Sequence, residues 1–169
     1  MLSYSLRNFR LDDCQDLARH LNNRNITQLL SRVPEPYHES DAREFISGLI
    51  DDEKSAERRF CNRAITVNDR VIGCVGFTLD PETKSGVIGY WLAEEYWGRG
   101  IMTHAARQMI DYAFSTLHLV TIKGSTKVEN IGSQNVLKKL GFKYVGDGTV
   151  RTWNGDVLPV KNYELSNTN

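Results

Sequence analysis

EEYWGRGIMTHAARQMIDYAFST, residues 94–116, decides the fold of this chain, because a short glycine loop there runs directly into a strong helix pattern. Residues 87–92, just before it, form an apolar run typical of a strand. After the loop, apolar residues recur with helical spacing. They are Ile101, Ala105, Met109 and Ala113, flanked by Met102, Ala106, Ile110, Phe114 and Leu117. The local order is therefore strand, glycine turn, helix.

The glycine loop has the chemistry of an anion site. The first backbone N–H groups of a helix have no partner within the helix, and glycines at Gly98 and Gly100 let a ligand approach them without a Cβ in the way. Phosphate is the usual occupant of such a site. A second interpretation is that the two glycines only turn the chain. The glycines alone do not distinguish an anion site from a simple turn.

Composition limits the class of protein. A length of 169 residues predicts a single domain, residues 1–169. The 21 Lys and Arg balance the 21 Asp and Glu, so no overall field favours nucleic acid or an anionic membrane. The first residues lack the apolar core of a signal peptide, and no apolar run approaches the roughly 18 residues of a membrane span. We expect a soluble cytoplasmic protein.

The sequence predicts no metal site and no disulfide framework. Its three cysteines and four histidines are scattered, with no metal-ligand spacing between them: Cys14, Cys61, Cys74, His20, His38, His104 and His118. We expect the cysteines to be buried and reduced.

The periodicity predicts alternating helices and strands. Strands are expected at residues 4–10, 62–67, 71–79, 86–92, 119–124, 142–152 and 156–165, and helices from Asp12 or Asp13, at 26–30, from Ser40, from Ile101 and from Asn130. Asn68-Asp69 and Asn154-Gly155 are hairpin signals. A strand-helix-strand crossover should place residues 119–124 parallel to residues 86–92.

Three blocks, in this order, carry a resemblance to a known family: GYWL at 89–92, YWGRGIMT at 96–103, and NIGS at 130–133 followed by LKKLGF at 137–142. The chain resembles the GNAT superfamily of acyl-CoA-dependent N-acyltransferases, and is most similar to its RimJ/RimL-type branch, which acetylates the N-termini of ribosomal proteins. The resemblance implies an α/β fold of the α+β kind. A mixed, mostly antiparallel sheet of about seven strands would carry helices on both faces and one parallel strand pair at the cofactor cleft.

By this resemblance the glycine loop binds the pyrophosphate of coenzyme A, while the backbone of residues 90–92 pairs with the pantetheine arm as an added strand would. The loop departs from the family form at Trp97 and at Met102, which is bulkier than the usual glycine or alanine. Core packing is an alternative role for Tyr90 and Trp91. The implied cofactor-binding residues are Tyr90, Trp91, Leu92, Trp97, Gly98, Arg99, Gly100, Ile101, Met102, Thr103, Asn130 and Ser133.

The resemblance also implies catalytic roles. The backbone N–H of Leu92 would stabilise the thioester oxyanion. Many relatives use a tyrosine as the acid where this chain has Leu137, and Ser133 is the implied replacement, although it could equally serve only as a first-turn helix residue. Asn130 is expected to cap that helix. Glu94 could deprotonate the amine through water or be a solvated loop acid.

The predicted function is direct acetyl transfer from acetyl-CoA to a primary amine, such as a peptide N-terminal α-amine. Three alternatives stay open: a small-molecule amine as acceptor, a non-catalytic acyl-CoA sensor or interaction module, and a nucleotide-binding domain. The acceptor pocket is expected at residues 33–38 and 151–154. The resemblance also suggests a homodimer.

Overall fold

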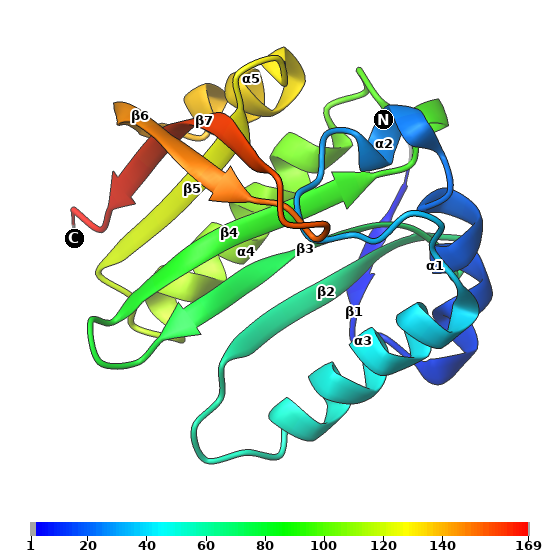
Figure 1. Ribbon diagram of the computed structural model, residues 1–169. Coiled ribbons are helices and arrows are strands. Elements are labelled where there is room, and N and C mark those ends of the chain that lie inside the picture. The colour runs from blue at the N-terminus through cyan, green and yellow to red at the C-terminus, as the bar shows by residue number, and fades with distance from the viewer. Residues whose placement is uncertain (1–2, 169) are drawn as a thin grey trace.

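A seven-stranded sheet with strand order β1-β2-β3-β4-β5-β7-β6 runs through the computed structural model, which describes residues 3–168 (Figure 1). The ends of the predicted domain, residues 1, 2 and 169, lie outside the described residues. The strands are β1 (Ser5–Arg7), β2 (Phe60–Val67), β3 (Arg70–Asp80), β4 (Ser85–Leu92), β5 (Thr121–Lys127), β6 (Lys143–Arg151) and β7 (Val157–Ser166). The helices are η1 (Leu11–Asp13), α1 (Cys14–His20), α2 (Arg24–Thr27), α3 (Glu39–Asp52), η2 (Glu94–Tyr96), α4 (Ile101–Ser115) and α5 (Ile131–Lys139).

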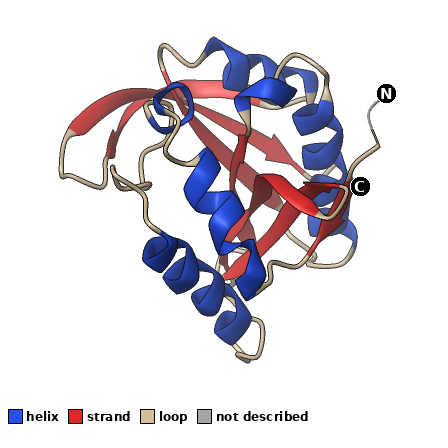
Figure 2. Cartoon of the chain, turned by 90° about the vertical axis from the view of Figure 1, so that its right-hand side faces the viewer, coloured by secondary structure: helices blue, strands red, loops and turns tan. Residues whose placement is uncertain are grey.

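Helices cover both faces of the sheet, as the resemblance implies (Figure 2). The helices α1 and α3 pack on one face over β2 and β3, whereas α4 and α5 lie on the other. Each face has its own buried apolar cluster. The sheet is therefore the middle layer of a three-layer domain.

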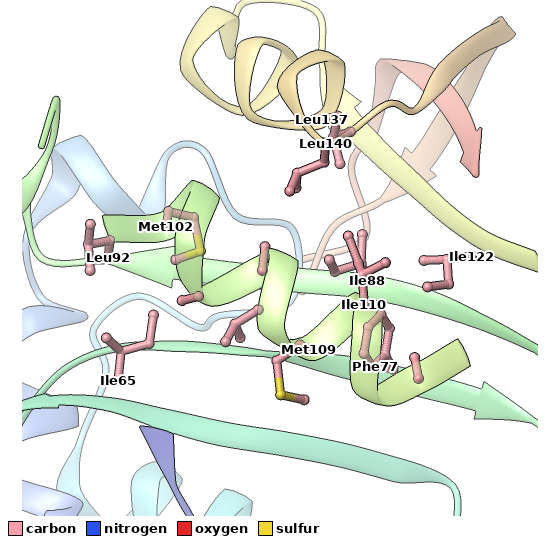
Figure 3. Packing of buried hydrophobic residues seen from close by; sticks show 14 of the residues in the cluster. Ile65, Phe77, Ile88, Leu92, Met102, Met109, Ile110, Ile122, Leu137 and Leu140 are labelled. Atoms are coloured by element: carbon pink, nitrogen blue, oxygen red, sulfur yellow. The ribbon is translucent and has the colours of Figure 1, made fainter. Parts of the chain in front are cut away.

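The helix α4 supplies the centre of the larger cluster (Figure 3). Its residues Met109 and Ile110 pack over Phe77 and Ile88 of the sheet. Every residue of the predicted stripe at positions 101, 105, 109 and 113 is buried. The helical spacing is thus confirmed, and burial of this face is what holds α4 on the sheet.

The antiparallel meander β2-β3-β4 is confirmed as well. Asn68 and Asp69 have positive φ angles of 49° and 63°, as a two-residue hairpin turn requires.

Some predicted boundaries of helices and strands were wrong. The expected helix at 26–30 is Arg24–Thr27, because the Asn23 side chain caps it by accepting from the Asn25 amide at 2.9 Å.

The strand expected at 119–124 is Thr121–Lys127. Leu119 instead closes the end of α4, since its amide donates to the Ala113 carbonyl at 3.1 Å, and Val120 donates to Lys84 at 2.8 Å. The final strand, β7, lies between β5 and β6.

The strands β4 and β5 are parallel, as predicted, but they pair only briefly. Their register covers Ser85–Val87 with Thr121–Lys123, whereas β5 pairs with β7 along its full length. Beyond Val87 the two parallel strands diverge. The periodicity does not predict this opening between neighbouring strands, which makes room for a cavity.

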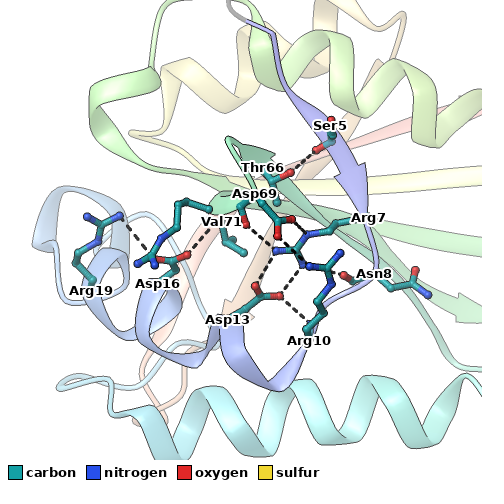
Figure 4. Close-up of polar contacts among 11 residues, drawn as sticks. Ser5, Arg7, Asn8, Arg10, Asp13, Asp16, Arg19, Thr66, Asp69 and Val71 are labelled. Atoms are coloured by element: carbon teal, nitrogen blue, oxygen red, sulfur yellow. Dashed lines mark hydrogen bonds and ion pairs between the residues drawn. The ribbon is translucent and has the colours of Figure 1, made fainter.

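A network of charged groups built on two buried aspartates, Asp13 and Asp16, fixes the N-terminal elements to the sheet (Figure 4). The guanidinium of Arg7 donates two hydrogen bonds of 2.8 Å to Asp13 and also reaches Asp69 at 2.9 Å. The Asp16 carboxylate, buried in α1, accepts from the Val71 amide at 3.0 Å and from Arg70 at 2.5 Å. These bonds attach η1 and α1 to the β2–β3 turn.

Asp16→Ala should lower the free energy of unfolding by about 2–3 kcal/mol, because the buried Val71 amide loses its acceptor and Arg70 loses its counter-ion. Urea unfolding monitored by circular dichroism measures this loss. Asp12→Ala, at an exposed position in η1, is the matched control and should stay within about 0.5 kcal/mol of the parent. Equal stability of the two variants would contradict the stabilising role of the Asp16 carboxylate.

His20 predicts a pH dependence of stability. Burial first, and then neighbouring Arg19, lower the pKa of His20 below its usual value, with Glu95 and Asp16 opposing. The unfolded chain therefore takes up this proton at a higher pH than the folded chain does. Neutral His20 should therefore contribute its full share to the free energy of unfolding above about pH 6.5, and this share should fall as the pH drops below that value. In urea unfolding at several pH values, His20→Gln should flatten this decline and exposed His38→Gln should not.

Candidate active site

A cavity of about 530 Å³ opens where β4 and β5 diverge. Its walls are the end of β4, the glycine loop, the start of α4, the N-terminal half of α5 and apolar residues around α2. The predicted site residues that line it are Tyr90, Trp91, Leu92, Trp97, Gly98, Gly100, Ile101, Met102, Thr103, Asn130 and Ser133. The fold thus brings the three sequence blocks to one place.

The glycine loop has the backbone shape of an anion site. Gly98 and Gly100 have φ angles of 72° and 77°, in the left-handed region that favours glycine. Gly100 is the N-cap of α4, and no side chain among residues 3–168 caps that helix end. The first amides of α4 are consequently available to a ligand in the cavity.

Two side-chain contacts shape the loop. The indole N–H of Trp97 donates to the Leu92 carbonyl at 2.7 Å and so folds the loop back onto β4. Arg99 is exposed, is not part of the cavity wall, and lies 5.8 Å from the centre of the Tyr96 ring. Its guanidinium is therefore a surface cation beside the glycine loop.

Met102, which departs from the family form, is accommodated by the core. Its side chain is 8% exposed and belongs to the large apolar cluster, near Leu92 (Figure 3). Since the thioether is buried there, the bulk of Met102 is absorbed by packing beneath the start of α4.

The cavity side of β4 presents main-chain groups. The Ala93 amide donates to the Ile72 carbonyl of β3 at 2.7 Å. Because hydrogen-bonding directions alternate along a strand, the N–H and C=O groups of Tyr90 and Leu92 point away from β3, toward the diverging β5. The N–H of Leu92, the predicted oxyanion donor, therefore faces the cavity. Trp91 packs in the second cluster, its ring centre 6.2 Å from that of His20.

Ser133 is held by two residues. Its amide donates to the Asn130 side chain at 3.0 Å, so Asn130 caps α5. Its hydroxyl oxygen lies 2.8 Å from the Tyr90 hydroxyl, which is also 3.3 Å from the Ser133 carbonyl. Sequence reasoning missed this Tyr90–Ser133 contact, because it depends on how far β4 and α5 stand apart.

Burial raises the pKa of Tyr90 to about 12, although its hydrogen bond to Ser133 acts in the opposite direction. Tyr90 is therefore a neutral phenol at physiological pH. Leu137, where the resemblance implies a tyrosine acid in many relatives, is fully buried in the core and offers no proton.

Glu94 lies outside the cavity wall. Its two carboxylate oxygens accept from the side-chain amides of Asn23, at 2.7 Å, and Asn25, at 2.9 Å. Glu94 therefore fastens the start of α2 to the loop that follows β4.

The segments expected to form the acceptor pocket approach each other. The Trp153 amide, at the tip of the β6–β7 hairpin, donates to the Ser31 carbonyl at 2.7 Å. Buried Lys127 donates to the Gln28 carbonyl, also at 2.7 Å. The hairpin consequently reaches across β4 to the loop that follows α2 (Figure 1).

The cysteines are buried and unpaired, and burial raises the pKa of Cys74 to about 12, which keeps that thiol protonated. Across residues 3–168, His, Cys, Asp and Glu nowhere gather into a group of three that could hold a metal ion. No helix in the same range has the length and apolarity needed to span a membrane.

Comparison with known proteins agrees with this geometry. Residues 4–143 match the acetyltransferase (GNAT) domain. The uncharacterized N-acetyltransferase p20 of Bacillus licheniformis is 29% identical over 143 residues, which cover 84% of this chain and 80% of that protein.

Two solved structures share the fold. The ribosomal-protein-S5-alanine acetyltransferase of Vibrio fischeri has a TM-score of 0.85 at 20% identity, with 100% of this chain and 96% of that one covered. The Mycobacterium smegmatis RimJ structure, in complex with CoA-disulfide, has a TM-score of 0.84 at 20% identity and coverages of 96% and 81%. With its domain match over most of its length and its cavity between diverging parallel strands, the chain belongs to the GNAT family of acetyltransferases.

Proposed function

We propose that this protein transfers the acetyl group of acetyl-CoA directly to a primary amine. The observation that carries the proposal is the cavity between β4 and β5, whose walls combine the amides of the glycine loop, the free edge of β4 and the hydroxyl of Ser133. Its volume of about 530 Å³ suits a pantetheine arm and thioester.

The residues at the cavity match the chemical groups of acetyl-CoA. Amides at residues 100–103 would bind the pyrophosphate, and Arg99 would add a positive charge beside it. The main chain of Tyr90 and Leu92 would hydrogen-bond to the amides of the pantetheine arm. When bound, acetyl-CoA supplies an activated thioester carbonyl.

In the transfer step, the lone pair of the amine nitrogen forms the new C–N bond, the C–S bond breaks, and its electron pair goes to sulfur. The nitrogen loses one proton to water and the sulfur gains one. The Leu92 N–H would stabilise the negative charge that develops on the thioester oxygen. The Ser133 hydroxyl would donate a hydrogen bond to the departing sulfur.

Water is a sufficient base for an α-amine, whose reference pKa is near 8. Because Glu94 accepts hydrogen bonds from Asn23 and Asn25 and lies outside the cavity wall, we assign it to the support of α2 on the acceptor side. The proton then leaves the amine to solvent at the open end of the cavity.

We place the acceptor between the loop after α2 and the tip of the β6–β7 hairpin, where Ser31 and Trp153 join. A peptide N-terminus is the favoured acceptor, because the V. fischeri neighbour is named for ribosomal protein S5. A cytoplasmic location and a homodimer belong to the same proposal.

Mass spectrometry of peptides and small amines, incubated with the protein and acetyl-CoA, tests the proposed acceptor. If acetyl-CoA binds but no acceptor is modified, the protein is an acyl-CoA sensor.

Ser133→Ala should lower kcat by about 10- to 100-fold, because the departing sulfur loses a hydrogen-bond donor. The affinity for CoA should change little, since the Asn130 cap bonds to the main chain of residue 133. Steady-state thiol release and calorimetry measure the two quantities. Ser115→Ala, at the far end of α4, is the control, and an unchanged kcat for Ser133→Ala would reject the assigned role.

Gly100→Ala should weaken acetyl-CoA binding by at least about tenfold in calorimetry, because an L-residue resists the φ angle of 77° and changes the direction of the first α4 amides. Gly141→Ala is the matched control: its φ of 92° imposes similar strain at the end of α5, outside the cavity wall. Equal affinities of the two variants would show that strain and not the anion site explains the loss.

A further inference from the structure

The hydroxyl groups of Tyr90 and Ser133 meet at the inner wall of the cavity, 2.8 Å apart. Tyr90 comes from β4 and Ser133 from the first turn of α5, two elements separated by the opening of the sheet. The contact is therefore a specific polar link across the cavity.

The main chain of Ser133 is fixed, whereas its hydroxyl can point in more than one direction. Its amide donates to the Asn130 side chain at 3.0 Å, and the side-chain torsions decide where the hydroxyl points. A serine in the first turn of a helix can turn its hydroxyl back to nearby main-chain groups. The Tyr90 hydroxyl lies 2.8 Å from Ser133 Oγ and 3.3 Å from the Ser133 carbonyl oxygen, so Oγ is its nearer partner and is held in a different direction.

We propose that Tyr90 is a positioning residue, which donates its hydroxyl proton to Ser133 Oγ and thereby directs the Ser133 proton toward the sulfur of bound CoA. This inference rests on the proposed function, in which Ser133 faces the departing thiolate. It assigns to the Tyr90 side chain a role separate from that of its main chain.

The direction of donation follows from charge. A hydroxyl has one proton, so Ser133 can donate a hydrogen bond either to the Tyr90 oxygen or to a ligand in the cavity. When the C–S bond breaks and its electron pair moves to sulfur, the negative sulfur is the stronger acceptor. Ser133 then donates to sulfur, and a lone pair of its Oγ is left for the Tyr90 proton.

Tyr90 keeps its proton throughout. Burial raises its pKa to about 12, whereas a thiol has a reference value of about 8.5. Transfer from the phenol to the thiolate would be strongly uphill, so the proton that the sulfur gains is the one that the amine nitrogen releases to solvent. Tyr90 consequently acts only through the hydrogen bond to Ser133.

The test is a titration of the CoA thiol in the complex of CoA with the protein, followed by the ultraviolet absorbance of the thiolate with the CoA-free protein subtracted. A donor held at sulfur lowers the thiol pKa. Tyr90→Phe should therefore raise the thiol pKa by about one unit relative to the parent complex. Ser133→Ala should raise it at least as much, and the double variant should match Ser133→Ala alone.

Tyr112→Phe is the matched control, because this tyrosine lies on α4 outside the cavity wall. An unchanged thiol pKa in Tyr90→Phe would overturn the proposal. So would additive effects in the double variant, because they would mean that Tyr90 acts independently of Ser133.

The kinetic prediction is a roughly tenfold lower kcat for Tyr90→Phe, with KM for acetyl-CoA within about twofold of the parent. The two measurements separate the hypotheses. A protein that binds CoA and transfers no acetyl group defeats the proposed function, yet its thiol titration still decides the role of Tyr90. Normal turnover with an unshifted thiol pKa in Tyr90→Phe defeats only the positioning role.

Discussion

The early divergence of β4 from β5 is the constraint on which the rest of this structure depends. A parallel pair that ran its full length would close the sheet and leave no cavity. Instead, β5 stays with β7 along its whole length while β4 continues with β3. Leu137 packs at this opening: a Cβ at Gly124 would lie 3.2 Å from its side chain and 3.3 Å from that of Ile88. A side chain at position 124 would therefore require Leu137 and Ile88 to move by a few tenths of an ångström.

The main-chain groups on the free edge of β4 explain why the opening suits a ligand. A gap that widens between two strands leaves main-chain groups without a strand partner, and such groups take their hydrogen bonds from side chains, water or a ligand. The Trp97 indole satisfies one of them, the carbonyl of Leu92. The groups of Tyr90 and the N–H of Leu92 face the space that a linear amide chain fills. The cavity thus presents the hydrogen-bonding pattern of an open strand edge.

Much of the fold was predictable because its signals are local. Helical spacing in α4, the turn at Asn68-Asp69 and the parallel placement of β5 all follow from short-range rules and are confirmed. The divergence after Val87 and the insertion of β7 were not predictable, since both depend on which strands compete for one edge. At the site, the sequence indicated the blocks but not the contacts between them. The Tyr90–Ser133 pair and the Asn23–Glu94–Asn25 cluster join residues far apart in the chain.

The place of β7 between β5 and β6 has a consequence for the length of chain that the cavity requires. Residues 157–166 pair with β5 from Thr121 to Lys127, along the edge of β5 that faces away from β4. A chain cut before residue 157 would keep the glycine loop, α4 and α5, but it would lose the strand that covers this edge of β5 and the hairpin whose tip bonds to Ser31.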